Sequence, residues 1–164
     1  MQNHLSTNRL FLDILTLEDY EFIIQLLNTK GWIEFIGDRN VHSKDEAIAY
    51  INKILDSPTI YYWVVRIKNG NLPAGIVSFL KRDYLENFDI GFAFLPEFTG
   101  KGYAYEAVKE VLSMLNTDPE YTPVLATTIP GNENSIKLLI KLGLHFEKEL
   151  EVGKEKLHIY TNAT

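Results

Sequence analysis

The sequence predicts an α+β fold, a mixed sheet of about seven strands with helices on both faces. Segments with strand and helix patterns follow one another in the order β, α, α, β, β, β, α, β, α, β, β. A run of hairpins followed by alternating strands and helices is typical of such a sheet. The chain has 164 residues, and we expect residues 1–164 to form a single domain.

The first half of the chain is predicted from local patterns. Leu10, Leu12 and Ile14 alternate on one face of a strand. Thr16–Asp19 and Ser43–Glu46 are capping-box patterns that begin helices, and an Asn-Gly pair favours a tight hairpin. The predicted elements are a strand over 5–15, a helix from 16 to about 28–31, a loop or broken helix over 32–42, a helix from 43 that stops before 58, and strands over 60–68 and 73–80.

The second half is organised around residues 88–115. An aromatic strand ends at Pro96, a short loop carries Gly100 and Gly102, and a helix begins at once. The apolar residues of this helix recur at helical spacing, at Ala104, Ala107, Val108, Val111, Leu112 and Leu115. The remaining predicted elements are a strand over 124–129, a helix over 135–142 and strands over 144–151 and 155–161.

The loop before the long helix has the features of an anion-binding site. The first turn of a helix leaves N–H groups without intrahelical partners and carries positive potential, so phosphate binds there. Gly100 and Gly102 permit close approach and positive φ, and Lys101 adds a charge. The pattern is no P-loop, because Gly follows Lys101, and no dinucleotide fingerprint, because Tyr105 replaces the third Gly. A flexible capping turn is the alternative for this loop taken alone.

This segment resembles motif A of the GNAT acetyltransferases, most closely the branch of the RimJ/RimL ribosomal-protein N-acetyltransferases. The matching positions are Ile90, Gly91, Phe92, Pro96, Phe98, Gly100, Gly102, Tyr103, Ala104, Glu106 and Ala107. A second block over 130–143 is similar to the family's Pro-x-Asn-x-x-Ser helix, with Pro130, Asn132, Ser135, Lys141 and Gly143. The order and separation of the two blocks make the resemblance specific, and it implies the GNAT-like, mostly antiparallel twisted sheet.

The resemblance implies acetyl transfer from acetyl-CoA to a primary amine of a protein N-terminus or a small molecule. The amine would attack the thioester directly, with no metal and no covalent intermediate. The expected cofactor-binding residues are Phe92, Ala93 and Phe94 beside the pantetheine, Thr99, Gly100, Lys101, Gly102, Tyr103 and Ala104 around the pyrophosphate, and Asn132 and Ser135 in the second block.

Asp89 and Ser135 are the candidate catalytic residues. Asp89 precedes Ile90, where the histone acetyltransferase branch carries its catalytic Glu, and is a candidate base acting through water; a solvated strand-end carboxylate is the alternative. The Tyr that protonates the leaving thiolate in many family members is absent, since Leu139 occupies its place. Ser135 matches a Ser of the RimJ/RimL branch that could donate to the sulfur, or it caps a helix. The rival bases are Glu34, Asp38, Glu97 and Glu106.

The acceptor pocket is the part of the site that the residues specify least. By the same resemblance it is expected at Trp32, Phe35, Asp38, Arg39 and Tyr62, although aromatic side chains at such places also pack in the core. An α-amino acceptor with a pKa near 8 is about one tenth neutral at pH 7 and needs little base assistance. The identity of the amine stays open, as does the choice between monomer and homodimer.

Composition excludes several other classes of function. The chain has no cysteine, which excludes a disulfide scaffold and a thiolate nucleophile, and its four histidines share no metal-ligand spacing. A net charge of −6 argues against nucleic-acid binding. No apolar run reaches bilayer length and no export signal is evident, so we expect a cytoplasmic protein with no membrane partner. A non-catalytic acyl-CoA-binding or sensing module and a nucleotide-binding regulatory domain are the alternative functions.

Overall fold

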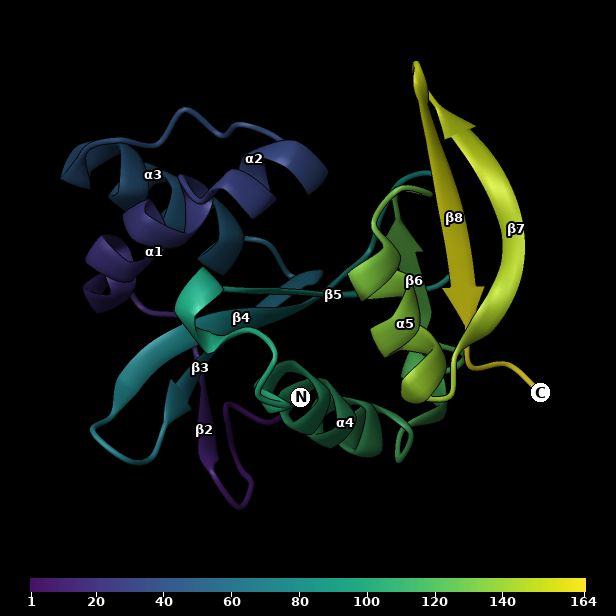
Figure 1. Ribbon diagram of the computed structural model, residues 1–164, viewed down its shortest axis with the longest axis horizontal. Coiled ribbons are helices and arrows are strands. Elements are labelled where there is room, and N and C mark those ends of the chain that lie inside the picture. Colours follow the sequence, from purple (N-terminus) through teal and green to yellow (C-terminus); the bar gives the residue numbers. More distant parts are fainter.

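The computed structural model describes residues 1–164 and shows one eight-stranded sheet with helices on both faces (Figure 1). The predicted fold class is confirmed. The strands are β1 His4–Ser6, β2 Leu10–Ile14, β3 Ile60–Ile67, β4 Leu72–Leu80, β5 Asp89–Phe94, β6 Leu125–Thr128, β7 His145–Val152 and β8 Glu155–Thr161. The helices are α1 Tyr20–Leu27, α2 Lys30–Phe35, α3 Lys44–Leu55, α4 Tyr103–Leu115 and α5 Glu133–Lys141, with short 3₁₀ turns η1 Leu17–Asp19, η2 Pro96–Phe98 and η3 Pro119–Tyr121.

The sheet has the strand order β1-β2-β3-β4-β5-β6-β8-β7. Every neighbouring pair is antiparallel except β5 and β6, which are parallel and are joined through α4. A parallel pair requires such a crossover, because its two strands run in the same direction. The two strands of the C-terminal hairpin, β7 and β8, form the far end of the sheet and extend beyond the helices (Figure 1).

The N-terminal strand prediction was wrong in one respect, because residues 5–15 form two strands rather than one. The amide of Thr7 donates to the carbonyl of Leu10 at 2.9 Å, and the chain reverses so that Leu5 pairs with Leu12. Polar residues between Leu5 and Leu10 interrupt the apolar alternation at this turn. The extra strand explains why the sheet has eight strands instead of about seven.

Residues 32–42, predicted as a loop or broken helix, contain the end of the short helix α2. Thr29 caps this helix by accepting a hydrogen bond from the amide of Trp32 at 3.3 Å. The helix ends where the amides of Ile36 and Gly37 both donate to the carbonyl of Trp32. A single turn and a half of helix leaves too few repeats for a period to be visible in the sequence.

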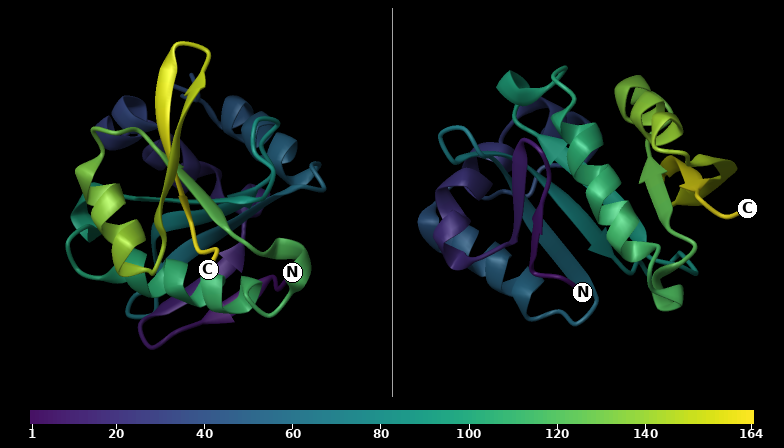
Figure 2. Two further views of the ribbon diagram at one scale, coloured as in Figure 1. Left: turned by 90° about the vertical axis from the view of Figure 1, so that its right-hand side faces the viewer. Right: turned by 90° about the horizontal axis from the view of Figure 1, so that it is seen from below.

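Two hydrophobic cores lie on opposite faces of the sheet. Helices α1 and α3 and the buried Trp32 of α2 pack with Val64 and Ile76 on one face. Helix α4 and Leu139 of α5 pack with Trp63, Val77 and other strand residues on the other face. Figure 2 shows α4 lying across the strands in the view from below. The capping boxes predicted at Thr16 and Ser43 are both present.

Strands β5 and β6 separate almost at once, and this divergence positions the site. Strand β5 pairs with β4 at six positions, from Asp89–Leu80 to Phe94–Gly75, but with β6 only at Asp89–Leu125. The edge of β5 that faces β6 is therefore unpaired beyond Asp89. The sequence did not predict this feature, since the register of two strands joined by a helix leaves no local signal.

Candidate functional site

The loop between β5 and α4 presents a series of backbone donors without acceptors. The amide of Thr99 donates to Pro96 and that of Glu106 donates to Gly102, but the amides of residues 100–105 donate to no group of the protein. Residues 99–102 are exposed, and Tyr103 is half-buried. Six consecutive free N–H groups at the start of a thirteen-residue helix form a ready anion-binding surface.

The backbone of this loop depends on its glycines. Gly102 is the N-cap residue of α4 and has φ +82°, a left-handed conformation in which a side chain is strained. Gly100 is also left-handed, with φ +72°. A Cβ at Gly102 would stand 3.3 Å from Nη2 of Arg9, so a larger residue would meet both strain and a neighbour. The positive φ predicted for these two glycines is therefore present, and their contact with an anion stays a prediction.

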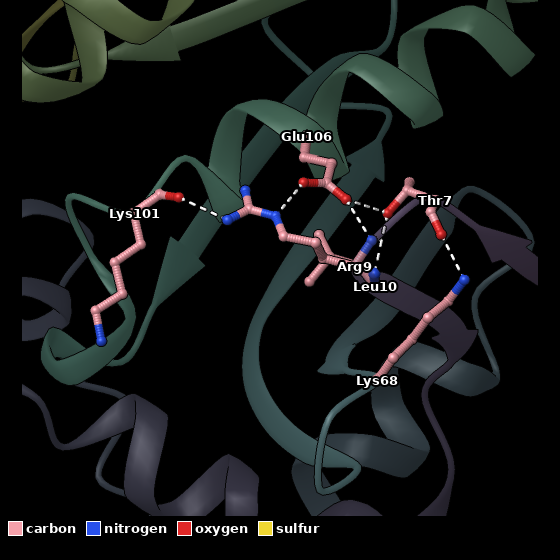
Figure 3. A network of polar contacts seen from close by, with 6 residues as sticks. All are labelled: Thr7, Arg9, Leu10, Lys68, Lys101 and Glu106. Carbon is pink, nitrogen blue, oxygen red and sulfur yellow. Dashed lines mark hydrogen bonds and ion pairs between the residues drawn. The ribbon is translucent and has the colours of Figure 1, made fainter.

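A polar network ties the N-terminal hairpin to this loop (Figure 3). Nε of Arg9 donates to Oε2 of Glu106 at 2.7 Å, and Nη1 of Arg9 donates to the carbonyl of Lys101 at 3.0 Å. The backbone amide of Arg9 and the hydroxyl of Thr7 both donate to Oε1 of Glu106, at 2.8 Å and 2.6 Å. The Arg9 guanidinium also lies 4.4 Å from the centre of the Tyr103 ring.

This network keeps Glu106 ionised. Partial burial raises the pKa of the Glu106 carboxyl, but the hydrogen bonds from Thr7 and Arg9 outweigh this effect and leave the pKa below its ordinary value. Glu106 stands in the first turn of α4, where the helix dipole also favours a negative charge. Its carboxylate is committed to these donors, which supports a structural role and gives a specific reason for its position.

Asp89 lies at the point where β5 and β6 diverge. Oδ1 accepts a hydrogen bond from the amide of Thr127 at 2.8 Å, and Oδ2 accepts from the hydroxyl of Thr127 at 3.2 Å and from Nε of Arg82 at 2.5 Å. Burial raises the pKa of the Asp89 carboxyl, and the Arg82 charge and the Thr127 hydrogen bonds counter only part of that rise. Asp89 is thus buried, not solvated at a strand end as the alternative interpretation supposed.

Helix α5 brings Asn132 and Ser135 to the side of β6. Oδ1 of Asn132 accepts a hydrogen bond from the amide of Ser135 at 3.3 Å, which makes Asn132 the cap of this helix. The hydroxyl of Ser135 and the side-chain NH₂ of Asn132 make no hydrogen bond within the protein, and both residues are half-buried. Leu139, in the place of the missing Tyr, is buried in the core.

The five predicted acceptor residues divide into packing and surface positions. Trp32 is 5% exposed and belongs to the core between α1, α3 and the sheet, and its indole N–H is buried without a partner. Phe35 is half-buried, and Asp38 accepts a hydrogen bond from the amide of Asn40 at 2.8 Å. The structure therefore does not gather all five side chains around one surface.

Arg39 and Tyr62 do come together, through a third residue. The phenol groups of Tyr62 and Tyr50 influence each other's pKa, and the Arg39 guanidinium lowers the pKa of both against the larger effect of burial. Burial raises the pKa of the Tyr62 phenol. On the same face, Tyr62 of β3 pairs with Ser78 of β4, which in turn pairs with Gly91 of β5. Tyr50 and Ser78 were missed in the sequence, because neither stands in a recognisable motif.

Arg9 and Thr7 were also missed as site residues. They lie within the predicted strand over 5–15 and stand 97 and 99 residues from Glu106 along the chain, so no local pattern connects them to the loop. The signal that could have found them is the presence of a charged and a hydroxyl residue within an otherwise apolar strand pattern.

Three other features of the structure bear on function: metal clusters, membrane-spanning helices and hollows in the surface. No group of three or more His, Cys, Asp or Glu side chains is arranged to hold a metal ion. No helix has both the length and the apolar character needed to cross a membrane. A hollow beside the C-terminus is lined by Asn116, Thr122, Pro123, Asn162, Ala163 and Thr164.

Comparison with known proteins identifies the relatives of this chain. Residues 9–145 match the acetyltransferase (GNAT) domain family. The chain is 24% identical over 156 residues to the uncharacterized N-acetyltransferase YnaD of Bacillus subtilis (strain 168), a match that covers 93% of this chain and 91% of YnaD.

Solved structures of low sequence identity share the fold. A ribosomal-protein-S5-alanine acetyltransferase from Vibrio fischeri superimposes with a TM-score of 0.82 at 19% identity, covering 98% of this chain and 96% of the other. A RimL ribosomal L7/L12 α-N-protein acetyltransferase in complex with coenzyme A gives a TM-score of 0.81 at 14% identity, covering 94% of each chain.

Proposed function

The chain belongs to the acetyltransferase (GNAT) domain family, and we propose that it is an acetyl-CoA-dependent N-acetyltransferase of the RimJ/RimL-like branch. In this proposal a primary amine of a protein N-terminus or a small molecule attacks the thioester directly. The main support is the series of free amides at residues 100–105, next to a strand edge that is open beyond Asp89. Such a surface suits a pyrophosphate, and the open edge of β5 suits an extended amide-containing chain.

The residues assigned to the cofactor are those that the resemblance implies, and the geometry of the loop and of β5 supports the assignment. The pyrophosphate would lie on the amides from Gly100 to Ala104, because the amide of Thr99, also expected there, already donates to Pro96. The pantetheine would pair with main-chain groups of Phe92 to Phe94. The side-chain NH₂ of Asn132 is free to contact the cofactor while its oxygen caps α5.

Acetyl transfer requires one new bond, one broken bond and one net proton movement. The amine nitrogen forms a bond to the acetyl carbon, the carbon–sulfur bond breaks, and the proton lost by nitrogen is balanced by the proton that the thiolate takes up. Proximity supplies much of the rate, because both reactants are held in one site. In this proposal the free hydroxyl of Ser135 donates to the sulfur.

Asp89 stays the candidate base in this proposal, and the hydrogen bonds that its carboxylate accepts limit how it can take up a proton. Oδ2 accepts two hydrogen bonds from protein donors and Oδ1 accepts one, so the remaining lone pair of Oδ1 is where Asp89 would take a proton. Its raised pKa suits a base better than an ordinary aspartate. An α-amino acceptor makes the smallest demand on such a group, because about a tenth of it is already neutral at pH 7.

The test combines cofactor binding with a turnover screen. Acetyl-CoA at millimolar concentration should raise the Tm of the protein, and Gly102→Val should remove this increase because it strains the loop and meets Arg9. Free-thiol release should then appear with at least one amine in a panel of peptides, polyamines and amino acids. A melting curve that acetyl-CoA leaves unchanged would overturn the proposal.

A non-catalytic acyl-CoA-binding module is the second candidate. It is favoured by Leu139 in place of the family's Tyr and by the burial of Asp89 among three hydrogen-bond donors of the protein. Such a protein would be stabilised by acetyl-CoA but would release no thiol with any amine. Asp89→Asn discriminates further, since loss of turnover with intact cofactor binding would support a catalytic role for this carboxylate.

A further inference from the structure

We propose that Arg9 is a positioning residue of the phosphate loop, held by Glu106 so that it fixes the peptide between Lys101 and Gly102. The inference rests on the proposed function, because that function assigns this loop to the cofactor's pyrophosphate. It adds to the site a residue from the N-terminal hairpin, outside both motif blocks.

The first step concerns the direction of one amide. Nη1 of Arg9 donates to the carbonyl oxygen of Lys101 at 3.0 Å. In a trans peptide the C=O and the following N–H point in opposite directions. Holding the Lys101 carbonyl against Arg9 therefore turns the N–H of Gly102 away from Arg9. That N–H lies within the series of free amides at residues 100–105.

The second step is that Arg9 itself is fixed. Its Nε and its backbone amide donate to the two oxygens of Glu106, and its guanidinium lies over the Tyr103 ring. Tyr103 and Glu106 stand three residues apart on α4 and so face the same side of the helix. Figure 3 shows Arg9 between the Glu106 carboxylate and the Lys101 carbonyl. Helix α4, whose N-terminus forms part of the anion site, thus also holds Arg9 in the position from which it orients the loop.

The third step is that the loop needs such a restraint. Gly100 and Gly102 both have positive φ, and glycine has the largest conformational freedom of any residue. Ordering the loop when the cofactor binds would cost affinity, whereas a loop that is already oriented avoids this cost. The paired charge of Glu106 offsets that of Arg9, so we expect the contribution of Arg9 to be mainly geometric.

A second arginine provides a matched control. Arg66 of β3 donates to Asp19 of η1, so like Arg9 it is an arginine paired with an acidic residue of a helical segment. The Arg66 side chain is 23% exposed and that of Arg9 is 41% exposed, so neither is a core position. Arg66 makes no hydrogen bond to the phosphate loop. Loss of Arg66 should lower stability without changing cofactor binding.

The experiment compares two acetyl donors that differ only in the part the loop would bind. Arg9→Ala, Glu106→Gln and Arg66→Ala would each be assayed with acetyl-CoA and with S-acetylpantetheine, which lacks the pyrophosphate and the nucleotide. Arg9→Ala and Glu106→Gln should raise KM for acetyl-CoA about tenfold and leave kcat at saturation nearly unchanged, as expected for lost uniform binding. The rate with S-acetylpantetheine should not change. Arg9→Lys should restore only part of the lost affinity for acetyl-CoA, since one ammonium group does not reproduce the several donors of the planar guanidinium.

Titration calorimetry with coenzyme A gives a readout that needs no acceptor. The two network variants should show about a tenfold higher Kd, and Arg66→Ala the wild-type Kd. An unchanged Kd in both network variants, or equal losses with both donors, would overturn the role of Arg9. Failure of the wild-type protein to bind coenzyme A would instead overturn the proposed function.

Discussion

Asp89 and Glu106 make nearly the same contacts in two regions of the molecule. Each carboxylate accepts hydrogen bonds from an arginine Nε, from a threonine hydroxyl and from a backbone amide. Asp89 joins β5 to β6 and to the segment after β4, whereas Glu106 joins α4 to the N-terminal hairpin. Similar chemistry therefore serves two connections between segments that are distant in the sequence.

The two sites differ in burial, and burial decides the sign of the pKa shift. The Asp89 side chain is 2% exposed and that of Glu106 is 20% exposed. Burial raises the pKa of Asp89 above its ordinary value, while the hydrogen bonds from Thr7 and Arg9 take the pKa of Glu106 below it despite partial burial. The comparison teaches that two carboxylates with the same kinds of hydrogen-bond donor can have pKa shifts of opposite sign, because they lose different amounts of hydration on folding.

The largest expected effect is the difference in stability between two alanine variants. Asp89→Ala leaves the Arg82 guanidinium and the Thr127 amide without their acceptor at a buried place, and should cost about 3 kcal/mol of unfolding free energy. Glu106→Ala breaks a more exposed network, which includes the bond from Thr7, and should cost about 1.5 kcal/mol of unfolding free energy. Urea unfolding at pH 7 measures both. Equal losses would show that burial does not separate the two networks.

The second effect is that the contributions of Glu106 and Asp89 to stability depend on pH in opposite directions. The folded pKa of Glu106 is lowered, so its stabilising contribution is present above the unfolded pKa of about 4 and is lost as pH falls through the folded value. The folded pKa of Asp89 is raised, so its contribution is complete below the unfolded pKa of about 4 and is lost as pH rises through the folded value.

Urea unfolding between pH 3.5 and pH 7 tests this pair of signs, over a range that spans the ordinary carboxyl pKa of about 4. The free-energy difference between wild type and Glu106→Gln should grow as the pH rises. The difference between wild type and Asp89→Asn should shrink over the same range. Parallel pH profiles for the two variants would contradict the assigned directions.

The smallest expected effect compares the two threonines. Thr7→Val removes a bond to Glu106 and a second bond, since the Thr7 hydroxyl also accepts from the amide of Leu10 at 3.1 Å. Thr7→Val should lower the free energy of unfolding by about 1 kcal/mol. Thr127→Val removes only the 3.2 Å hydroxyl bond, because the Thr127 amide still donates to Asp89, and should cost about 0.5 kcal/mol. Thermal unfolding of both variants and of the matched serine variants would check this order.

Local patterns were enough to predict most of the elements. The helical spacing from Ala104 to Leu115 predicted α4, and the capping boxes predicted the starts of α3 and of the η1 turn that leads into α1. The glycine loop was predicted as an anion site because its features are contained in a few consecutive residues. The N-terminal hairpin was not predicted, because a turn within a short polar stretch has the same local pattern as a strand interruption.

The environment of each candidate carboxylate could not be predicted. In the sequence, Asp89 was a candidate base or a solvated strand-end carboxylate, and Glu106 was a rival base within motif A. Nothing in the sequence showed that one lies in the core and the other faces Arg9. The grouping of Tyr50, Tyr62 and Arg39 was equally hidden, since these residues come from a helix, a strand and a loop.

The sequence by itself determined most of the secondary structure, the faces of the longer helices and the glycine loop, because each depends on residues within one turn or one strand. Only the tertiary structure decided which donors reach each carboxylate, where β5 and β6 part, and which carboxyl loses its water. These properties depend on contacts between residues up to 99 positions apart, and such contacts produce no local pattern or periodicity in the amino-acid sequence.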